Sequence, residues 1–61
     1  MNAIRHWRLK SGLTQSEIAK TLKIDRSTIA KWEAGKSQPR FDKLPQLASI
    51  LSCNINDLFE H

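Results

Sequence analysis

Apolar residues recur along the 61-residue chain at intervals of three and four, the spacing that places them on one face of an α-helix. No stretch alternates apolar and polar residues with a period of two, and no Asn-Gly type of turn indicates a hairpin. The pattern predicts an all-α fold of five helices. Residues 1–61 are expected to form a single compact domain, because so short a chain can bury only one small core.

The first predicted helix is short. Ile4 and Trp7 lie three apart on its inner face, and the helix is expected to end near Ser11. Gly12 follows as a residue that can adopt the left-handed conformation of a C-terminal cap.

The second predicted helix covers residues 15–22, and its start is marked by the sequence TQSE. This is a capping box, in which the Thr14 hydroxyl accepts a hydrogen bond from the Glu17 backbone N–H and the Glu17 carboxylate accepts one from the Thr14 N–H. Its apolar residues are Ile18, Ala19 and Leu22.

The third predicted helix covers residues 26–34. Asp25 is suited to the N-cap and Gly35 to the stop after the last turn. Ile29 and Trp32 lie three apart on the inner face, so they are expected in the core.

The fourth helix is expected to start at Asp42 or Lys43, with Asp42 as N-cap, because Pro45 then falls within the first turn, where its missing N–H has no intrahelical partner. Its apolar face is Leu44, Leu47, Ala48 and Leu51. A fifth, short helix is expected after Asn54 as N-cap, with Ile55, Leu58 and Phe59.

The helices over 15–22 and 26–34 are joined by about three residues, too few for antiparallel packing, so they must cross steeply, with the small Ala19 at their contact. This is the geometry of a helix-turn-helix, in which the first helix lies across the DNA backbone and the second enters the major groove. Polar residues then project from the tip and outer side of the second helix: Arg26, Ser27, Thr28 and Lys31.

Charge agrees with a polyanionic partner. Residues 1–40 hold nine basic and three acidic side chains, whereas residues 41–61 hold one basic and three acidic ones, and the sequence pI is about 9.7. One end of the molecule is therefore expected to be basic, as in proteins that bind nucleic acid.

Other classes of protein have little support. A single cysteine, Cys53, excludes a disulfide scaffold, and two distant histidines, His6 and His61, argue against zinc. Apolar runs are too short to span a membrane, and no signal peptide is evident. No phosphate-binding glycine loop is present and Cys53 has no histidine partner, so we expect no enzymatic activity, no cofactor, and a small core role for Cys53.

The segments LTQSEIAKTL (13–22), STIAKWEAGK (27–36), PRF (39–41) and LPQLASIL (44–51) together resemble the helix-turn-helix family of lambdoid phage repressors and Cro proteins (XRE-like), with 434-type repressors the nearest in appearance. Lys23 departs from the pattern, because the family usually has glycine at that turn position. A left-handed lysine costs roughly 1 kcal/mol.

The resemblance implies roles for individual residues. Gln15 would touch a DNA phosphate and brace the recognition helix, and Arg8 and Glu33 would form a structural ion pair between the first and third helices. The DNA-binding positions implied together are Thr14, Gln15, Arg26, Ser27, Thr28, Lys31, Lys36 and Arg40. Arg26, Ser27 and Thr28 match base-contacting positions, while Lys36 and Arg40 match segments that contact the backbone.

These observations predict a Cro-like or repressor-like regulator of phage, prophage or bacterial origin, acting in the cytoplasm or nucleoid by promoter occlusion or contact with RNA polymerase. We expect it to bind a pseudo-palindromic double-stranded operator as a homodimer that is weak in solution, with dimer contacts in residues 50–61 and in the loop after Gly35. Alternatives are a protein-interaction module such as an antitoxin, and charge-driven coating of nucleic acid. The sequence leaves open the operator, the sign of regulation, and whether the chain is a domain of a longer repressor.

Overall fold

The computed structural model describes residues 3–59 and contains no strand within that range. The elements in chain order are α1 (Ala3–Ser11), α2 (Gln15–Leu22), α3 (Arg26–Ala34), the 3₁₀ helix η1 (Phe41–Lys43), α4 (Leu44–Ile50) and the 3₁₀ helix η2 (Ile55–Phe59). The all-α prediction is confirmed. The predicted count of five helices is not matched, because four of the elements are α-helices and the predicted fifth helix is η2.

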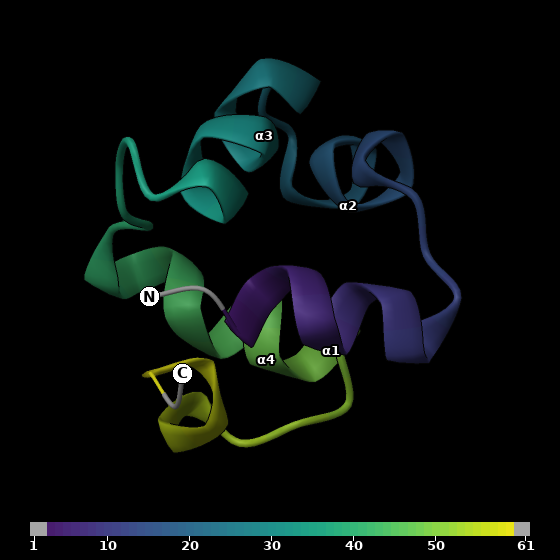
Figure 1. Ribbon diagram of the computed structural model, residues 1–61, viewed down its shortest axis with the longest axis vertical. Coiled ribbons are helices and arrows are strands. Elements are labelled where there is room, and N and C mark those ends of the chain that lie inside the picture. The colour runs from purple at the N-terminus through teal and green to yellow at the C-terminus, as the bar shows by residue number, and fades with distance from the viewer. Residues whose placement is uncertain (1–2, 60–61) are drawn as a thin grey trace.

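The helix pair α2 and α3 lies on one side of the molecule, and α1 and α4 lie on the other (Figure 1). α3 contacts both α2 and α1, while α2 contacts α4. The η2 segment packs against α1 and α4 and so completes the end of the core opposite the α2–α3 pair. The first three helices end within a residue of the predicted bounds.

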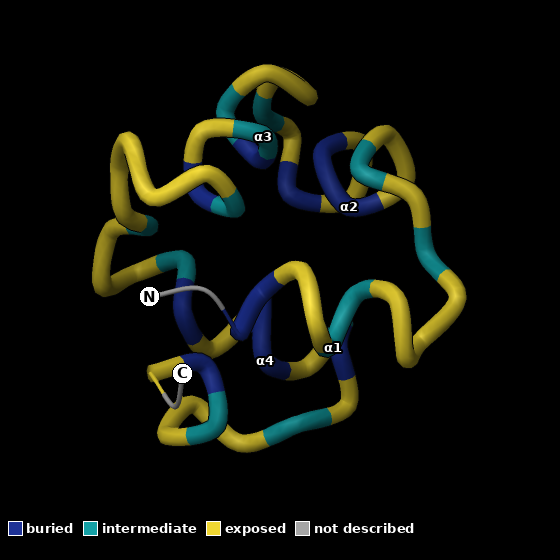
Figure 2. Tube along the Cα trace, in the orientation of Figure 1, coloured by how far each residue is buried: buried dark blue, intermediate teal, exposed yellow. Residues whose placement is uncertain are grey.

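One hydrophobic core joins all four α-helices and η2 (Figure 2). Its fully buried large side chains are Ile4, Ile18, Ile29, Leu47, Leu51 and Leu58. Trp32 is also buried, as the spacing predicted, and so is Ala19. Trp7 is only half-buried, with the Lys10 ammonium 4.9 Å from the centre of its ring, so it lies at the margin of the core.

All four α-helices end in the same backbone motif. After each helix a residue with positive φ donates its N–H to the carbonyl three residues back, and the next N–H reaches the carbonyl five residues back. Gly12 and Gly35 serve this position after α1 and α3, as predicted. Lys23 (φ 61°) and Ser52 (φ 55°) serve it after α2 and α4, so two helix ends carry the steric cost of a side chain in the left-handed region.

The start of α4 differs from the prediction. The α-helix begins at Leu44, Lys43 is its N-cap, and Asp42 lies inside η1 rather than capping the helix. Pro45 has no N–H to donate to the carbonyl of Phe41 four residues before it. The N–H of Leu44 donates to that carbonyl instead, which is the tighter 3₁₀ pattern.

The end of the described chain also differs. The segment after Asn54 forms a 3₁₀ turn, in which the Asp57 N–H donates to the Asn54 carbonyl at 3.0 Å. A further bond runs from the Asn54 backbone N–H to the Asp57 carboxylate at 2.9 Å. Five residues close too few α-helical bonds to favour the wider helix. Leu58 is buried, whereas Ile55 and Phe59 are exposed.

Candidate nucleic-acid interface

The N-terminus of α2 is fixed by the predicted capping box. The Glu17 N–H donates to the Thr14 hydroxyl at 3.0 Å, and the Thr14 N–H donates to the Glu17 carboxylate at 2.8 Å. This reciprocal pair satisfies two backbone donors at the helix start and leaves Thr14 exposed. Gln15 is the first residue of α2 and is half-buried.

The first turn of α3 presents polar side chains to solvent. Arg26 and Ser27 are exposed and Thr28 is half-buried, while Ile29 directly after them is fully buried. Asp25 occupies the N-cap position as predicted, but its side chain makes no capping hydrogen bond. The helix is therefore anchored by the packing of its inner face, and its tip remains accessible.

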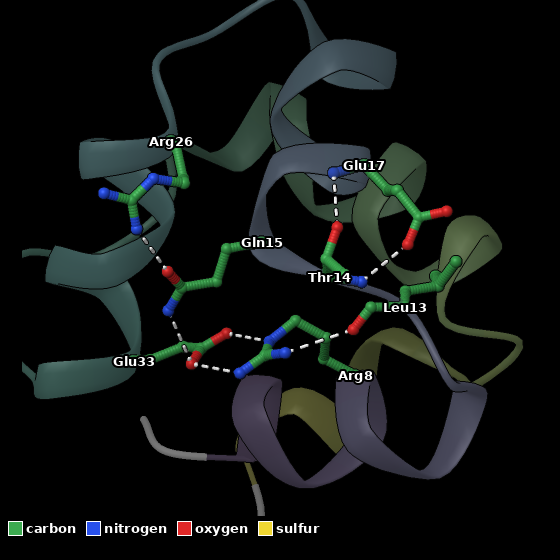
Figure 3. A network of polar contacts seen from close by, with 7 residues as sticks. All are labelled: Arg8, Leu13, Thr14, Gln15, Glu17, Arg26 and Glu33. Atoms are coloured by element: carbon green, nitrogen blue, oxygen red, sulfur yellow. Dashed lines mark hydrogen bonds and ion pairs between the residues drawn. The ribbon is translucent and has the colours of Figure 1, made fainter.

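A chain of polar contacts links the three N-terminal helices (Figure 3). The Arg8 guanidinium donates to both carboxylate oxygens of Glu33, from Nε at 2.6 Å and from Nη2 at 3.1 Å, and its Nη1 donates to the Leu13 carbonyl at 3.1 Å. The Gln15 Nε2 donates to the same carboxylate at 3.1 Å. Arg26 Nη1 donates to the Gln15 Oε1, also at 3.1 Å.

The ion pair at the centre of this chain is shielded from water. The side chains of Arg8 and Glu33 are 12% and 6% exposed. The hydrogen bond to Glu33 and its negative charge raise the pKa of the Arg8 guanidinium, against the opposing effect of burial. The Arg8 guanidinium therefore stays charged, and the pair ties α1 to α3, in the positions that the resemblance implied.

The capped start of α2 and the tip of α3 face a common surface pocket of about 420 Å³, lined by Arg8, Thr14, Gln15, Ser16 and Arg26. A basic side chain and the N-terminus of a helix at one site favour an anion such as a phosphate group. The pocket brings together three of the predicted DNA-binding residues.

The remaining predicted residues lie outside that pocket. Ser27 and Lys31 are exposed on α3, and Lys36 and Arg40 are exposed at the two ends of the loop that leads to η1. The Lys31 carbonyl accepts from the N–H of Lys36, so the backbone at the start of this loop is held to the end of α3.

The structure adds two candidates that sequence reasoning missed. Ser16 lines the pocket described above, and Arg5 lines a neighbouring one of about 260 Å³ together with Gln15 and Ala30. Arg5 is exposed on α1. Its spacing of three residues from Arg8 was the available signal, since it puts both on one face of the helix.

A second, apolar surface lies on the other part of the chain. Phe41 is 88% exposed and Phe59 is 51% exposed. Both line a pocket of about 160 Å³, whose complete lining is Gln38, Pro39, Phe41, Leu44 and Phe59. We call these five residues the aromatic patch. An exposed aromatic cluster of this kind is typical of a surface that contacts another protein.

Within residues 3–59, no three His, Cys, Asp or Glu side chains cluster closely enough to hold a metal ion. None of the helices in this range is both long and apolar enough to cross a membrane. Cys53 is half-buried against the core, and this burial, together with the charge of Asp57, raises the pKa of its thiol. His6 is exposed, and His61 lies outside the described residues.

Comparison with known proteins identifies the family. The sequence pattern described as Helix-turn-helix matches residues 4–58, so the chain belongs to the helix-turn-helix family. No solved structure matches the chain.

Three relatives illustrate the similarity. An uncharacterized HTH-type transcriptional regulator of Archaeoglobus fulgidus is 39% identical over 56 residues, which are 92% of this chain and 80% of that protein. The HTH-type transcriptional regulator DicA of Escherichia coli is 37% identical over 51 residues, 84% of this chain and 38% of DicA. The HTH-type transcriptional activator BcrR of Enterococcus faecalis is 33% identical over 55 residues, 90% of this chain and 27% of BcrR.

The chain thus spans most of the archaeal relative and less than half of the two bacterial ones. These proteins are named as transcriptional regulators and not as enzymes, in agreement with the sequence prediction. Because the relatives include archaeal proteins, a bacterial or phage source and a specific likeness to 434-type repressors both remain predictions.

Proposed function

We propose that this protein binds double-stranded DNA with sequence preference and regulates transcription in a Cro-like or repressor-like manner. The N-terminus of α3 enters the major groove while α2 lies across the backbone. The observation that carries the proposal is the first turn of α3, where Arg26 and Ser27 are exposed at the tip of a helix whose inner face is buried. The names of the relatives support the same function.

In this proposal Arg26 reads a base. Its guanidinium can form two hydrogen bonds with guanine O6 and N7, which supply roughly 1–3 kcal/mol of discrimination. Ser27 and Thr28 contact neighbouring base edges, and Lys31 reaches a base or a phosphate. Phosphate contacts come from Thr14, Gln15, Lys36 and Arg40, and Arg40 can also enter a narrow minor groove.

The proposal includes a homodimer on DNA, because one domain of this size makes a small interface and two half-sites about 10 base pairs apart fit a symmetric dimer. The aromatic patch supports a second copy as partner, since Phe41 is almost fully exposed and lies just after the loop that follows α3. Its small extent agrees with weak association without DNA. Such a dimer acts by promoter occlusion or by contact with RNA polymerase, wherever the cell keeps its DNA, in the cytoplasm or nucleoid.

A protein-interaction module is the alternative. An apolar or acidic tip on α3 would favour it, and the exposed Arg26 and Ser27 argue for DNA instead.

Selection from a random pool of duplexes about 25 base pairs long tests the proposal, because that length holds two half-sites one helical turn apart. We expect enrichment of a two-fold symmetric site. Arg26→Ala should abolish the preference at one or two base pairs, whereas Lys10→Ala, which removes the same charge beside Trp7, should retain it.

Two outcomes would contradict the proposal. Retention of DNA without any enriched sequence would indicate binding by charge alone. No retention would remove DNA as the partner and favour a protein ligand.

A further inference from the structure

Arg5 is an exposed cation on α1 that makes no hydrogen bond or ion pair within residues 3–59. It lines the surface pocket of about 260 Å³, whose complete lining is Arg5, Arg8, Gln15, Ala30, Glu33 and Ala34. Arg8 and Gln15 also line the larger pocket at the start of α2, so the two pockets adjoin. Arg5 therefore borders the same stretch of surface as the start of α2 and the tip of α3.

Two of the charges around these pockets cancel each other. Arg8 and Glu33 form the ion pair whose side chains are 12% and 6% exposed. No other acidic side chain is among the residues that line either pocket. The net positive charge there comes from Arg5 and Arg26. Because Arg26 is the residue proposed to read a base, Arg5 is the cation that remains for the DNA backbone.

The part of the smaller pocket that α3 supplies leaves Arg5 accessible. Ala30 and Ala34 stand about one turn apart on α3, the first half-buried and the second exposed. Their methyl groups offer no hydrogen-bond partner to the Arg5 guanidinium and take up little space. An anion can therefore approach Arg5 across this side of α3.

The position of Arg5 within α1 is unfavourable for the helix itself. Arg5 is the third residue of α1, and the first turn of this helix holds no acidic side chain. The N-terminus of a helix carries partial positive charge, so it repels a cation. Burial does not offset this repulsion, since Arg5 is exposed. An anion from outside the chain would account for an arginine at this position.

We propose that Arg5 binds a phosphate group of the DNA backbone, so that α1 is a third DNA-contacting helix beside α2 and α3. The inference rests on the proposed function. A guanidinium can donate two parallel hydrogen bonds to one phosphate, and all five N–H donors of Arg5 are available. Such a contact helps to fix the orientation of the domain on the duplex and adds no base preference of its own.

Arg5→Gln tests this, because glutamine removes the charge and keeps a long, helix-forming side chain. Lys10→Gln is the matched control, since it removes one charge from the same helix at a lysine that lies over Trp7 and lines a different pocket. Arg5→Lys keeps the charge and should recover most of the binding. Thermal unfolding checks the fold, and Arg5→Gln should be at least as stable as the wild type, because the repulsion at the helix start is removed.

The readout is the salt dependence of affinity, measured on the selected site and on the same site with the base pair read by Arg26 changed. Each phosphate contact contributes about 0.9 to the slope of log affinity against log salt concentration. We expect Arg5→Gln to reduce the slope by about 0.9 for each bound copy. Binding should weaken about eightfold per copy at roughly 0.1 M salt, equally on both duplexes. Lys10→Gln should change both quantities much less.

The outcomes separate this inference from the proposed function. A wild-type protein that binds no duplex contradicts the proposed function, and the role of Arg5 with it. A wild-type protein that selects a site, with an Arg5→Gln variant that matches Lys10→Gln in slope and affinity, overturns the phosphate contact and leaves recognition by α3 intact. An Arg5→Gln variant that loses preference at one base pair also overturns it, because Arg5 would then read a base.

Discussion

The regions before and after residue 40 use different physical means to build their surfaces. In residues 3–40 polar side chains behind the surface are bound to one another, through the Arg8–Glu33 pair and Gln15, and the charge is strongly basic. In residues 41–59 the exposed feature is apolar: Phe41 and Phe59 flank a small pocket, and acidic groups outnumber basic ones.

Under the proposed function, this difference lets a domain of 61 residues hold two interfaces over one core. Hydrogen bonds and ion pairs specify direction, so they suit a surface that must match fixed base edges. Apolar contact is less directional and suits a weak surface that forms only when a second copy is held nearby. The shared core, with Ile29 from α3 and Leu47 from α4, holds the two surfaces in a fixed position relative to each other.

The largest expected effect comes from a substitution in the core that both regions share. Leu47→Ala removes a fully buried side chain from α4, and we expect the free energy of unfolding to fall by about 4 kcal/mol. Urea unfolding measures it. Leu9→Ala, at a leucine that is 59% exposed, is the control and should change stability by less than about 0.5 kcal/mol. Equal effects would mean that the C-terminal region does not share the core.

The second test removes one partner of the buried ion pair in the polar region. Glu33→Ala leaves the nearly buried Arg8 without its partner, and we expect a loss of about 3 kcal/mol in the free energy of unfolding. Replacing both residues, Arg8→Met with Glu33→Leu, removes the uncompensated charge and should cost less than the single change. If the double variant is less stable than Glu33→Ala, the ion pair itself stabilises the fold, beyond orienting the side chains that it contacts.

A smaller, paired test compares the two regions directly. Lys23→Gly and Ser52→Gly each remove a side chain from a residue with positive φ at a helix end, one in each region, and so relieve its steric strain. We expect each to raise the free energy of unfolding by about 0.5 kcal/mol, because the steric relief exceeds the extra entropy of glycine. Lys20→Gly, inside α2, should instead lower it by about 1 kcal/mol. A loss of stability for Lys23→Gly would show that the lysine side chain makes a compensating contact.

The smallest expected effect concerns Cys53 and pH. Burial and Asp57 raise the pKa of its thiol, so the folded state binds the proton more tightly than the unfolded state does. This contribution is complete below the ordinary thiol pKa and disappears as the pH rises through the raised value. Stability should therefore fall slightly more steeply above pH of about 9 in the wild type than in Cys53→Ala. Parallel urea curves for the two proteins at neutral and alkaline pH would test it.

Local chemistry was readable from the chain. The capping box of Thr14 and Glu17, and the glycines after the first and third helices, fixed the ends of α1, α2 and α3, because each bond involved joins residues at most five positions apart. Helical spacing likewise identified the buried Ile29 and Trp32. The basic tip of α3 followed from these boundaries, since they decide which residues stand in its first turn.

The tertiary structure decided what depends on distant partners. Two differences from the prediction are local instead: Pro45 cannot donate to the Phe41 carbonyl, so the Leu44 N–H does and the segment becomes η1, and the short last segment closes 3₁₀ turns. The exposure of Phe41 and Phe59 depends on which surface η2 covers. Gln15 meets Glu33 eighteen residues away and Arg26 eleven residues away. The orientation of the Gln15 amide follows from Glu33 and Arg26 together. Helical periodicity carries no information about contacts between helices, so only the packed fold could determine this orientation.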